Sequence, residues 1–253
     1  MSKTKNYKVK ASIFITCLVD QLFPAVGTGL VSVLKKAGVE VTFPKNQTCC
    51  GQPLFNSGFR KDAKELAKQN IEELANSEYI VVPSGSCAAM MKFVYKDLFG
   101  ENDKMRSMAS SLSPKVYEFS EFIVKILGVT NVGATYREHV TYHPSCHLLR
   151  EQQVDMEPKA LLDEVCGLVL EKLEDETVCC GFGGTFSVKY PGISEAMLMD
   201  KIQRIEETSA STVVACDLSC LMHIDGALRR KKSPIKAKHL IEILDNTESL
   251  PDR

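Results

Sequence analysis

Two features that would point to common classes of protein are missing from this 253-residue sequence. It has no excess of charge of one sign, because 31 Lys and Arg residues face 32 Asp and Glu residues, and this balance argues against nucleic-acid binding. It has no apolar run long enough to span a bilayer, and its polar, basic start does not resemble a secretory signal. We therefore expect a soluble, cytoplasmic protein with no transmembrane segment.

Motifs of familiar catalytic sites are missing as well. The sequence contains no recognisable Ser-His-Asp set, paired-carboxylate motif or flavin-binding fingerprint. Two glycine-rich stretches, at 27–29 and 181–184, carry Ser32 and Phe186 where a dinucleotide-binding loop needs its third glycine. We therefore predict no nucleotide site and no catalytic residue in this chain.

What the sequence does contain is cysteine: ten residues. Thiols stay reduced in the cytosol, so metal binding or redox chemistry explains them better than a disulfide scaffold. Nine of the ten form two series offset by about 130 residues, and Thr48-Cys49-Cys50-Gly51 corresponds to 178–181. The chain is therefore a duplicated unit, and we place one cysteine-rich repeat in residues 1–132 and the other in 133–253.

Within each repeat, short apolar runs of strand type alternate with helical patterns. This alternation predicts an α/β fold with a small parallel sheet flanked by helices in each repeat, the two repeats being pseudo-symmetric. The expected strands are 10–16, 39–43, 79–82 and 115–117, then 140–143, 169–173, 212–215 and 234–236. The expected helices are 24–37, 60–75, 87–99 and 119–127, then 158–165, 193–207, 221–229 and 239–244.

The nine repeated cysteines follow predicted strands. Because the carboxyl ends of parallel strands meet at one edge of a sheet, the cysteines of each repeat should share one pocket there. Soft thiolate ligands select zinc, copper(I) or an iron–sulfur cluster, and adjacent cysteines suit a multinuclear cluster better than one zinc ion. The glycine after each pair should let the backbone approach the cluster closely. The predicted metal ligands are Cys17, Cys49, Cys50 and Cys87 in the first site, and Cys146, Cys179, Cys180, Cys216 and Cys220 in the second.

The two predicted sites differ in one ligand. Pro83 occupies the position that corresponds to Cys216, so the first site has four cysteines and the second has five. Four thiolates suffice for zinc, and the first site therefore remains open to zinc or an iron–sulfur cluster. We expect an iron–sulfur cluster in the second.

Other candidate residues have plainer explanations. Cys166 has no counterpart in the first repeat, and we expect it in the core. His143 and His147 flank Cys146, where an imidazole either donates a hydrogen bond to cluster sulfur or belongs to a polar loop. His223 and His239 are expected at the surface.

The order Cys, then Cys-Cys-Gly, then a cysteine-containing loop, twice over, resembles the cysteine-rich CCG family. That family includes the B subunit of heterodisulfide reductase, and this sequence most resembles its members in lactate utilization, on segments 143–147, 179–187 and 215–220. One departure is that Cys216 and Cys220 are separated by three residues instead of two.

The resemblance implies [4Fe-4S] clusters, among which the non-cubane type is one option. It also implies an electron-transfer subunit of a complex that oxidises L-lactate to pyruvate, in which other subunits, including a ferredoxin-type iron–sulfur protein, are the partners. This chain would then be a subunit of an oxidoreductase complex that does not itself bind the substrate. The alternatives are a thiol–disulfide redox protein and a zinc-stabilised scaffold.

Overall fold

The computed structural model describes residues 9–246, which contain two four-stranded sheets with only parallel strand pairs. The strand orders are β2-β1-β3-β4 and β6-β5-β7-β8, so the second sheet repeats the topology of the first. The predicted α/β fold with two parallel-sheet repeats is confirmed. The strands are β1 (Lys10–Ile13), β2 (Glu40–Thr42), β3 (Tyr79–Val82), β4 (Val116–Glu118), β5 (His139–Tyr142), β6 (Val169–Glu171), β7 (Thr212–Ala215) and β8 (Lys236–His239).

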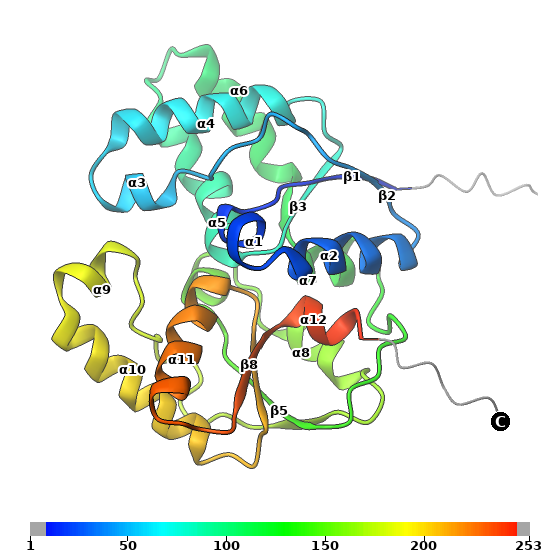
Figure 1. Ribbon diagram of the computed structural model, residues 1–253. Helices are drawn as coiled ribbons and strands as arrows, with labels where there is room; N and C mark the ends of the chain where they lie inside the picture. The colour runs from blue at the N-terminus through cyan, green and yellow to red at the C-terminus, as the bar shows by residue number, and fades with distance from the viewer. Residues whose placement is uncertain (1–8, 247–253) are drawn as a thin grey trace, which may run out of the picture.

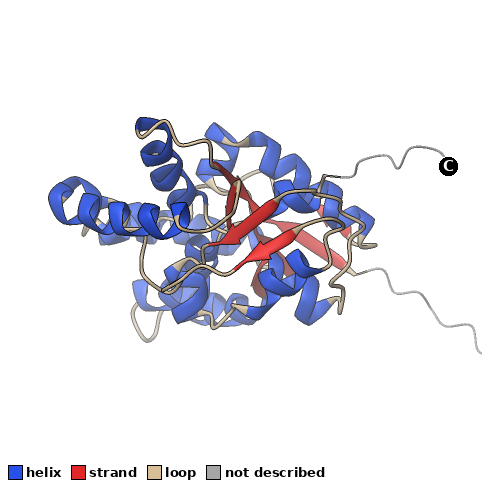
Figure 2. Ribbon diagram, turned by 90° about the horizontal axis from the view of Figure 1, so that it is seen from below, coloured by secondary structure: helices blue, strands red, loops and turns tan. Residues whose placement is uncertain are grey.

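Helices cover both sheets, which Figure 2 shows enclosed among them. Those of the first half are α1 (Cys17–Leu22), α2 (Pro24–Lys36), α3 (Gln52–Asn56), α4 (Arg60–Leu74), α5 (Gly85–Ala89), α6 (Lys104–Leu112) and α7 (Phe119–Glu121). Those of the second half are α8 (Met156–Asp163), α9 (Thr185–Lys189), α10 (Pro191–Glu206), α11 (Leu218–Arg230) and α12 (Leu240–Leu244). Residues 9–246 also contain short helical segments of other types. The π-helices are η1 (Met90–Val94), η4 (Phe122–Ile126) and η5 (His147–Glu151), and the 3-10 helices are η2 (Tyr95–Leu98) and η3 (Ser113–Lys115).

The long helices match the prediction, but the segments after β3 and β4 do not. Residues 87–99 and 119–127 were expected to form single helices, and each is instead a short α-helix that continues as a π-helical turn. The short helices α1, α3, α6 and α9 were not predicted, and β8 lies two residues later than expected. Helices α1, α3 and α9 have only five or six residues, which are too few positions to display a helical period, whereas α6 has nine.

The registers of the two sheets define which residues are equivalent. Ser12 of β1 is paired with Ile80 of β3, and Thr141 of β5 is paired with Val213 of β7 in the same way. Continuing along β1 and β5, Phe14 corresponds to His143. Their backbone N–H groups donate to Val81 O at 2.9 Å and Val214 O at 2.8 Å respectively.

The two halves pack reciprocally around a common core. Helix α2 of the first half lies against α12 of the second, and α8 of the second lies against α7 of the first (Figure 1). The contact at α2 is close, because a Cβ on Gly29 would lie 2.9 Å from Ile241 Cγ2. At the edge of this contact, Ser32 Oγ donates to Asp245 Oδ1 at 2.5 Å. Buried residues of both sheets belong to this one central cluster, so the halves are joined through their hydrophobic interior.

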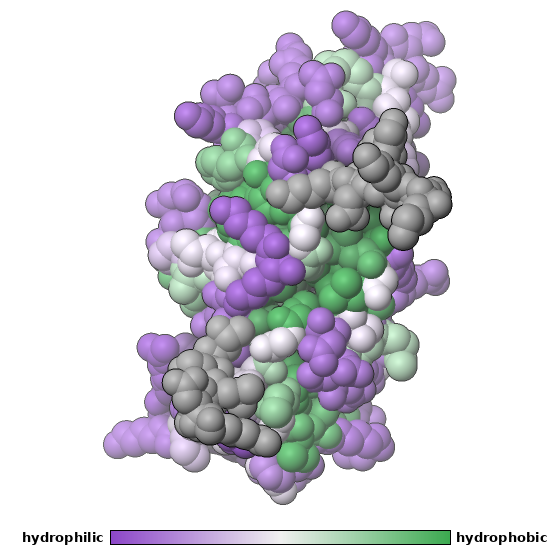
Figure 3. Space-filling model, turned by 90° about the vertical axis from the view of Figure 1, so that its right-hand side faces the viewer, coloured by the Kyte–Doolittle hydropathy of each residue, from purple (hydrophilic) through white to green (hydrophobic). Residues whose placement is uncertain are grey.

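A further apolar cluster lies on the outer side of each sheet, under α4 and α6 in the first half and under α10 and α11 in the second. On the face shown in Figure 3, hydrophobic residues gather across the middle of the molecule, whereas hydrophilic residues cover both ends. Of the helices in residues 9–246, none combines the length and the apolar character that a membrane crossing needs.

Candidate metal centre

A single cavity of about 430 Å³ lies where the carboxyl ends of the strands of both halves face each other. Its walls come from α1, α3 and α5 of the first half and from the starts of η5, α9 and α11 of the second. The structure therefore brings both predicted sites to one cavity, which the sequence had not indicated. The cysteines that line it are Cys17, Cys50, Cys87, Cys146, Cys179, Cys180 and Cys220.

In the first half, adjacent cysteines pair with different partners. Cys49 Sγ lies 3.6 Å from Cys17 Sγ, and Cys50 Sγ lies 3.2 Å from Cys87 Sγ. Two thiolates on one tetrahedral metal with bonds of about 2.3 Å lie about 3.8 Å apart, so small shifts would fit these pairs to a shared metal. Cys49 and Cys50 thus connect two distant loops, as expected for a group with several metal atoms.

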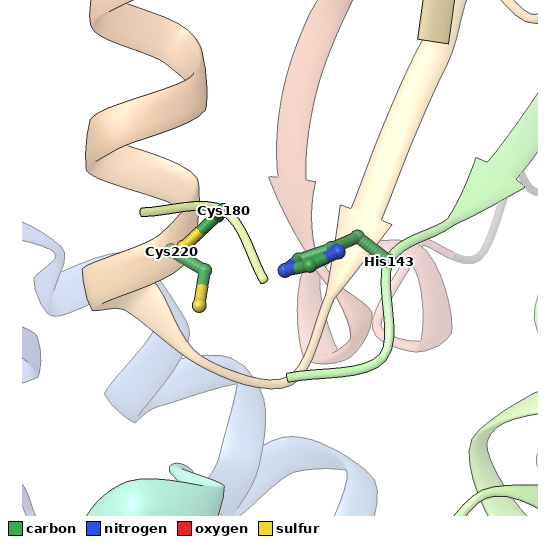
Figure 4. Close-up of side chains that lie close together, drawn as sticks. All are labelled: His143, Cys180 and Cys220. Atoms are coloured by element: carbon green, nitrogen blue, oxygen red, sulfur yellow. The ribbon is translucent and has the colours of Figure 1, made fainter. Parts of the chain in front are cut away.

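The second half repeats this arrangement and adds an imidazole. The thiols of Cys146 and Cys179 interact, and so do those of Cys180 and Cys220. Ligand atoms of His143, Cys180 and Cys220 all lie within 4.8 Å of one another, and all three residues are buried (Figure 4). The two donor sets, four thiols and four thiols with an imidazole, suit a thiophilic metal or an iron–sulfur group.

Charge in each cluster concentrates on one thiol. Hydrogen bonds from Cys17 and Cys50 hold the pKa of Cys49 well below its ordinary value, and those from Cys146 and Cys180 do the same for Cys179. The Gly181 N–H also donates to Cys179 Sγ at 3.4 Å. Metal ligation requires thiolates, and these two positions already favour that form.

The glycine after each cysteine pair is required by the fold. Gly51 and Gly181 both have φ of +85°, the left-handed region where glycine is favoured. A Cβ on Gly181 would lie 2.6 Å from the Ser194 carbonyl oxygen of α10, and one on Gly51 would lie 3.4 Å from that of Ala63 in α4. In this structure, the close approach at each glycine is to the backbone of a neighbouring helix; the expected approach to a cluster stays a prediction.

Equivalent buried polar residues anchor the two loops before the cysteine pairs. Asn70 of α4 accepts a hydrogen bond from Thr48 N at 2.8 Å and donates to Cys49 O at 3.0 Å. Lys201 of α10 replaces it in the second half, and its Nζ donates to the carbonyls of Asp175 and Glu176 at 3.3 and 3.1 Å. Burial lowers the pKa of Lys201.

A carboxylate joins the two halves next to the cavity. Asp217 is the N-cap of α11, and Ser84 in the equivalent position is the N-cap of α5. Asp217 Oδ2 accepts hydrogen bonds from Ser84 Oγ at 3.2 Å and from Ser86 N at 2.8 Å, across the boundary between the halves. The sequence analysis did not identify Asp217, although its N-cap position after a strand was a usable signal.

Cys216 is the one predicted ligand that the structure does not bring to a thiol cluster. It is fully buried beyond the end of β7, where its Sγ lies 3.6 Å from the hydroxyl of Tyr142, and it is not among the residues that line the cavity. Burial and the neighbouring Glu118 raise its pKa. Cys220 occupies the position that corresponds to Cys87, so the two halves contribute equivalent cysteines.

The expectations for Cys166 and His239 were wrong, and the structure distinguishes His143 from His147. Cys166 is exposed, not part of the core. His239 is buried and forms a capping box at the start of α12, so it is not a surface residue. His147 lines the cavity and pairs with Glu151 at 2.8 Å, whereas the imidazole of His143 lies beside Cys180 and Cys220. Burial lowers the pKa of His143 to about 3.

The chain belongs to the CCG family of cysteine-rich domain proteins, whose profile matches residues 11–92 and 140–225. It is 45% identical over 240 residues to lactate utilization protein A of Shouchella clausii, a comparison that covers 95% of this chain and 100% of that relative. It is 46% identical to lactate utilization protein A of Halalkalibacterium halodurans, covering 95% and 98%. Lactate utilization protein A 1 of Bacillus mycoides is 47% identical, covering 94% and 97%. Among solved structures, glutamate racemase RacE1 of Bacillus anthracis aligns at 12% identity with a TM-score of 0.36, covering 94% of this chain and 79% of that chain.

Proposed function

We propose that this protein is an iron–sulfur electron-transfer subunit of a complex that oxidises L-lactate to pyruvate. The observation that carries the proposal is the grouping of eight thiols in two equivalent sets, and seven of the eight line one cavity. The relatives named lactate utilization protein A, which match along nearly the whole chain, support the role in lactate utilization.

Each half would hold its own iron–sulfur group. Cys17, Cys49, Cys50 and Cys87 would bind the first, and Cys146, Cys179, Cys180 and Cys220 would bind the second. Such groups supply one-electron transfer when bound. The residues of this chain keep the thiolates in place, through Asn70 and Lys201 behind the cysteine loops and Asp217 between the halves. Because clustered thiols must stay reduced to bind a metal, we place the protein in the cytoplasm.

Substrate oxidation would then take place in a partner subunit, which passes electrons to this chain. We propose a ferredoxin-type iron–sulfur protein among the partners. Deleting the gene should abolish growth on lactate as the only carbon source, and the unchanged gene should restore it. A gene that encodes Cys50→Ser and Cys180→Ser together should fail to do so. Growth of the deletion strain on lactate at the normal rate would contradict the role in lactate utilization.

The metal assignment has its own test. Protein purified without oxygen should contain iron and acid-labile sulfide, absorb visible light and give an electron paramagnetic resonance (EPR) signal on reduction. A colourless protein with stoichiometric zinc would instead support a scaffold role.

A second function is favoured by the shared cavity. Its volume of about 430 Å³ is in the range of small-molecule sites, and thiols of both halves line it. A small disulfide bound there would lie beside both metal sites and, with two electrons and two protons, would yield two thiols. Consumption of small disulfides by the reduced protein would support this function, and the absence of such consumption would leave electron transfer between subunits.

A further inference from the structure

One buried position at which the two sites differ lies directly after the first strand of each half. In the register of the two sheets, His143 follows β5 in the place where Phe14 follows β1, and both side chains are buried. The equivalence extends to the backbone, since each residue donates its N–H to the neighbouring strand β7 or β3. An apolar ring in one half has therefore been replaced by a ring with two nitrogen atoms in the other.

The imidazole of His143 has no hydrogen-bond partner within the described part of the chain. Only 1% of its surface is exposed, and both Nδ1 and Nε2 are buried without a partner. A neutral imidazole carries one N–H donor and one lone pair, and leaving such groups unpaired in the interior destabilises the fold. The imidazole therefore needs a partner, and we expect it to contact that partner in the metal-bound protein.

The orientation of the ring indicates what that partner is. Figure 4 shows the ring directed toward the side chains of Cys180 and Cys220, with which it shares the 4.8 Å grouping of ligand atoms. The other histidines near the site are engaged elsewhere: His147 with Glu151, and His223 with Ser194 Oγ at 3.3 Å.

We propose that His143 is a metal ligand of the second site, beside Cys180 and Cys220. The first site, with Phe14 in the equivalent position, then binds its metal through sulfur alone. Imidazole nitrogen and thiolate sulfur are both ordinary ligands of iron and zinc. His143 thus takes the role of fifth ligand that the sequence analysis gave to Cys216. The binding of a metal group at this site rests on the proposed function. The contact between that group and His143 is inferred from the geometry of this site alone.

A neutral imidazole ligand changes the electronic character of the site. Imidazole in place of an anionic thiolate raises the reduction potential of iron–sulfur centres. Here the imidazole is added to a set of four thiolates that both sites have in common, so the two sites should differ in reduction potential.

Pulsed EPR on the reduced, anaerobically purified protein tests the ligand directly. Protein grown with ¹⁵N-histidine should show a strong nitrogen coupling from a bound imidazole. His143→Phe, which copies the residue of the first site, should lose that coupling and keep the iron of the first site. The matched control, Phe14→His, leaves the nitrogen coupling of the second site in place. A strong coupling that persists in His143→Phe, or that is missing from the wild type, overturns the proposal.

Anaerobic titration with Co²⁺ separates this proposal from the proposed function. Absorption bands of Co²⁺ differ between all-sulfur and mixed sulfur–nitrogen ligand sets. If the purified protein holds no iron but its second site binds Co²⁺ with nitrogen that His143→Phe removes, the ligand proposal stands and the iron–sulfur function fails. If the second site binds neither iron nor Co²⁺, or binds Co²⁺ equally in His143→Phe, the ligand proposal fails.

Discussion

Ser84 and Asp217 occupy equivalent positions in the two halves of this protein, and they are hydrogen-bonded to each other, with Ser84 Oγ donating to Asp217 Oδ2 at 3.2 Å. Each residue caps the helix that carries a cysteine of its own site, Cys87 in α5 and Cys220 in α11. The contact therefore ties the two cysteine clusters to each other at the point where the halves meet.

Replacing Asp217 should weaken this connection. Its two carboxylate oxygens accept from four donors: Ser84 Oγ and Ser86 N at Oδ2, and the N–H and hydroxyl of Ser219 at Oδ1. In Asp217→Asn an NH₂ group faces two of these donors, and we expect a loss of about 1–3 kcal/mol in the free energy of unfolding. Urea unfolding measures it. Ser84→Ala removes the cap of α5 and one of the four hydrogen bonds to Asp217, and should cost about 1 kcal/mol. Equal losses in the two variants would contradict the central role of Asp217.

The sequence predicted the sheets and the place of the cysteines, because both follow from local patterns. Alternating strands and helices define a parallel sheet, and the strand ends place Cys17, Cys50 and Cys87 together. It could not predict that the two sites share one cavity. That depends on reciprocal packing of α2 with α12 and α8 with α7, whose apolar faces look the same in the sequence whichever helix they contact.

The position of Cys216 could not be predicted for a related reason. Side chains at successive positions after a strand point in different directions, so a cysteine one step away from the strand end faces the core and one five steps away faces the cavity. The spacing in the sequence placed Cys216 and Cys220 in the same loop, but it did not show that their side chains point in different directions. The buried His239 was missed because a capping role leaves no periodic signal.

Cys216 and Cys220 should respond differently to substitution. Cys216→Ser should keep the wild-type metal content and EPR signals, since its side chain lies against Tyr142 away from the cavity. Cys220→Ser should lose the metal of the second site and keep that of the first. Metal analysis of the anaerobically purified variants measures both. If Cys216→Ser loses the same metal as Cys220→Ser, the ligand assignment from the sequence is right, and the loop after β7 rearranges on metal binding.

Glu118 should make stability depend on pH. It is fully buried and caps α7, and burial raises its pKa from 4.5 to about 7. Below pH 4.5 the carboxyl is protonated in both the folded and the unfolded chain, so it makes no difference there. Between pH 4.5 and 7 the unfolded chain ionises first, and this should lower the free energy of unfolding by roughly 3 kcal/mol.

Glu118→Gln isolates this effect from the other titrating groups. The amide oxygen still accepts the hydrogen bond from Ser120 N, but the side chain cannot ionise. The variant should be more stable than the wild type at pH 8, and the difference should disappear near pH 4. Urea unfolding at several pH values measures it. The carboxylate of Glu121, which also acts on the pKa of Glu118, is paired with Lys92 at 2.7 Å and is the same residue in both proteins. A stability difference that does not vary with pH would show that Glu118 is ionised in the folded protein throughout this range.

Gly181 should tolerate alanine much less well than the equivalent Gly51. Both have φ of +85°, and a left-handed alanine costs about 1–2 kcal/mol in either place. The new methyl group would lie only 2.6 Å from Ser194 O at position 181, against 3.4 Å from Ala63 O at position 51. Because the obstacle is helix backbone, the loop that carries Cys180 must move away from α10.

We therefore expect Gly51→Ala to lose about 1–2 kcal/mol and to keep its metal. Gly181→Ala should lose more than about 3 kcal/mol, together with the metal of the second site. Urea unfolding and metal analysis of the pair measure this contrast, and equal effects would mean that α10 yields as easily as α4.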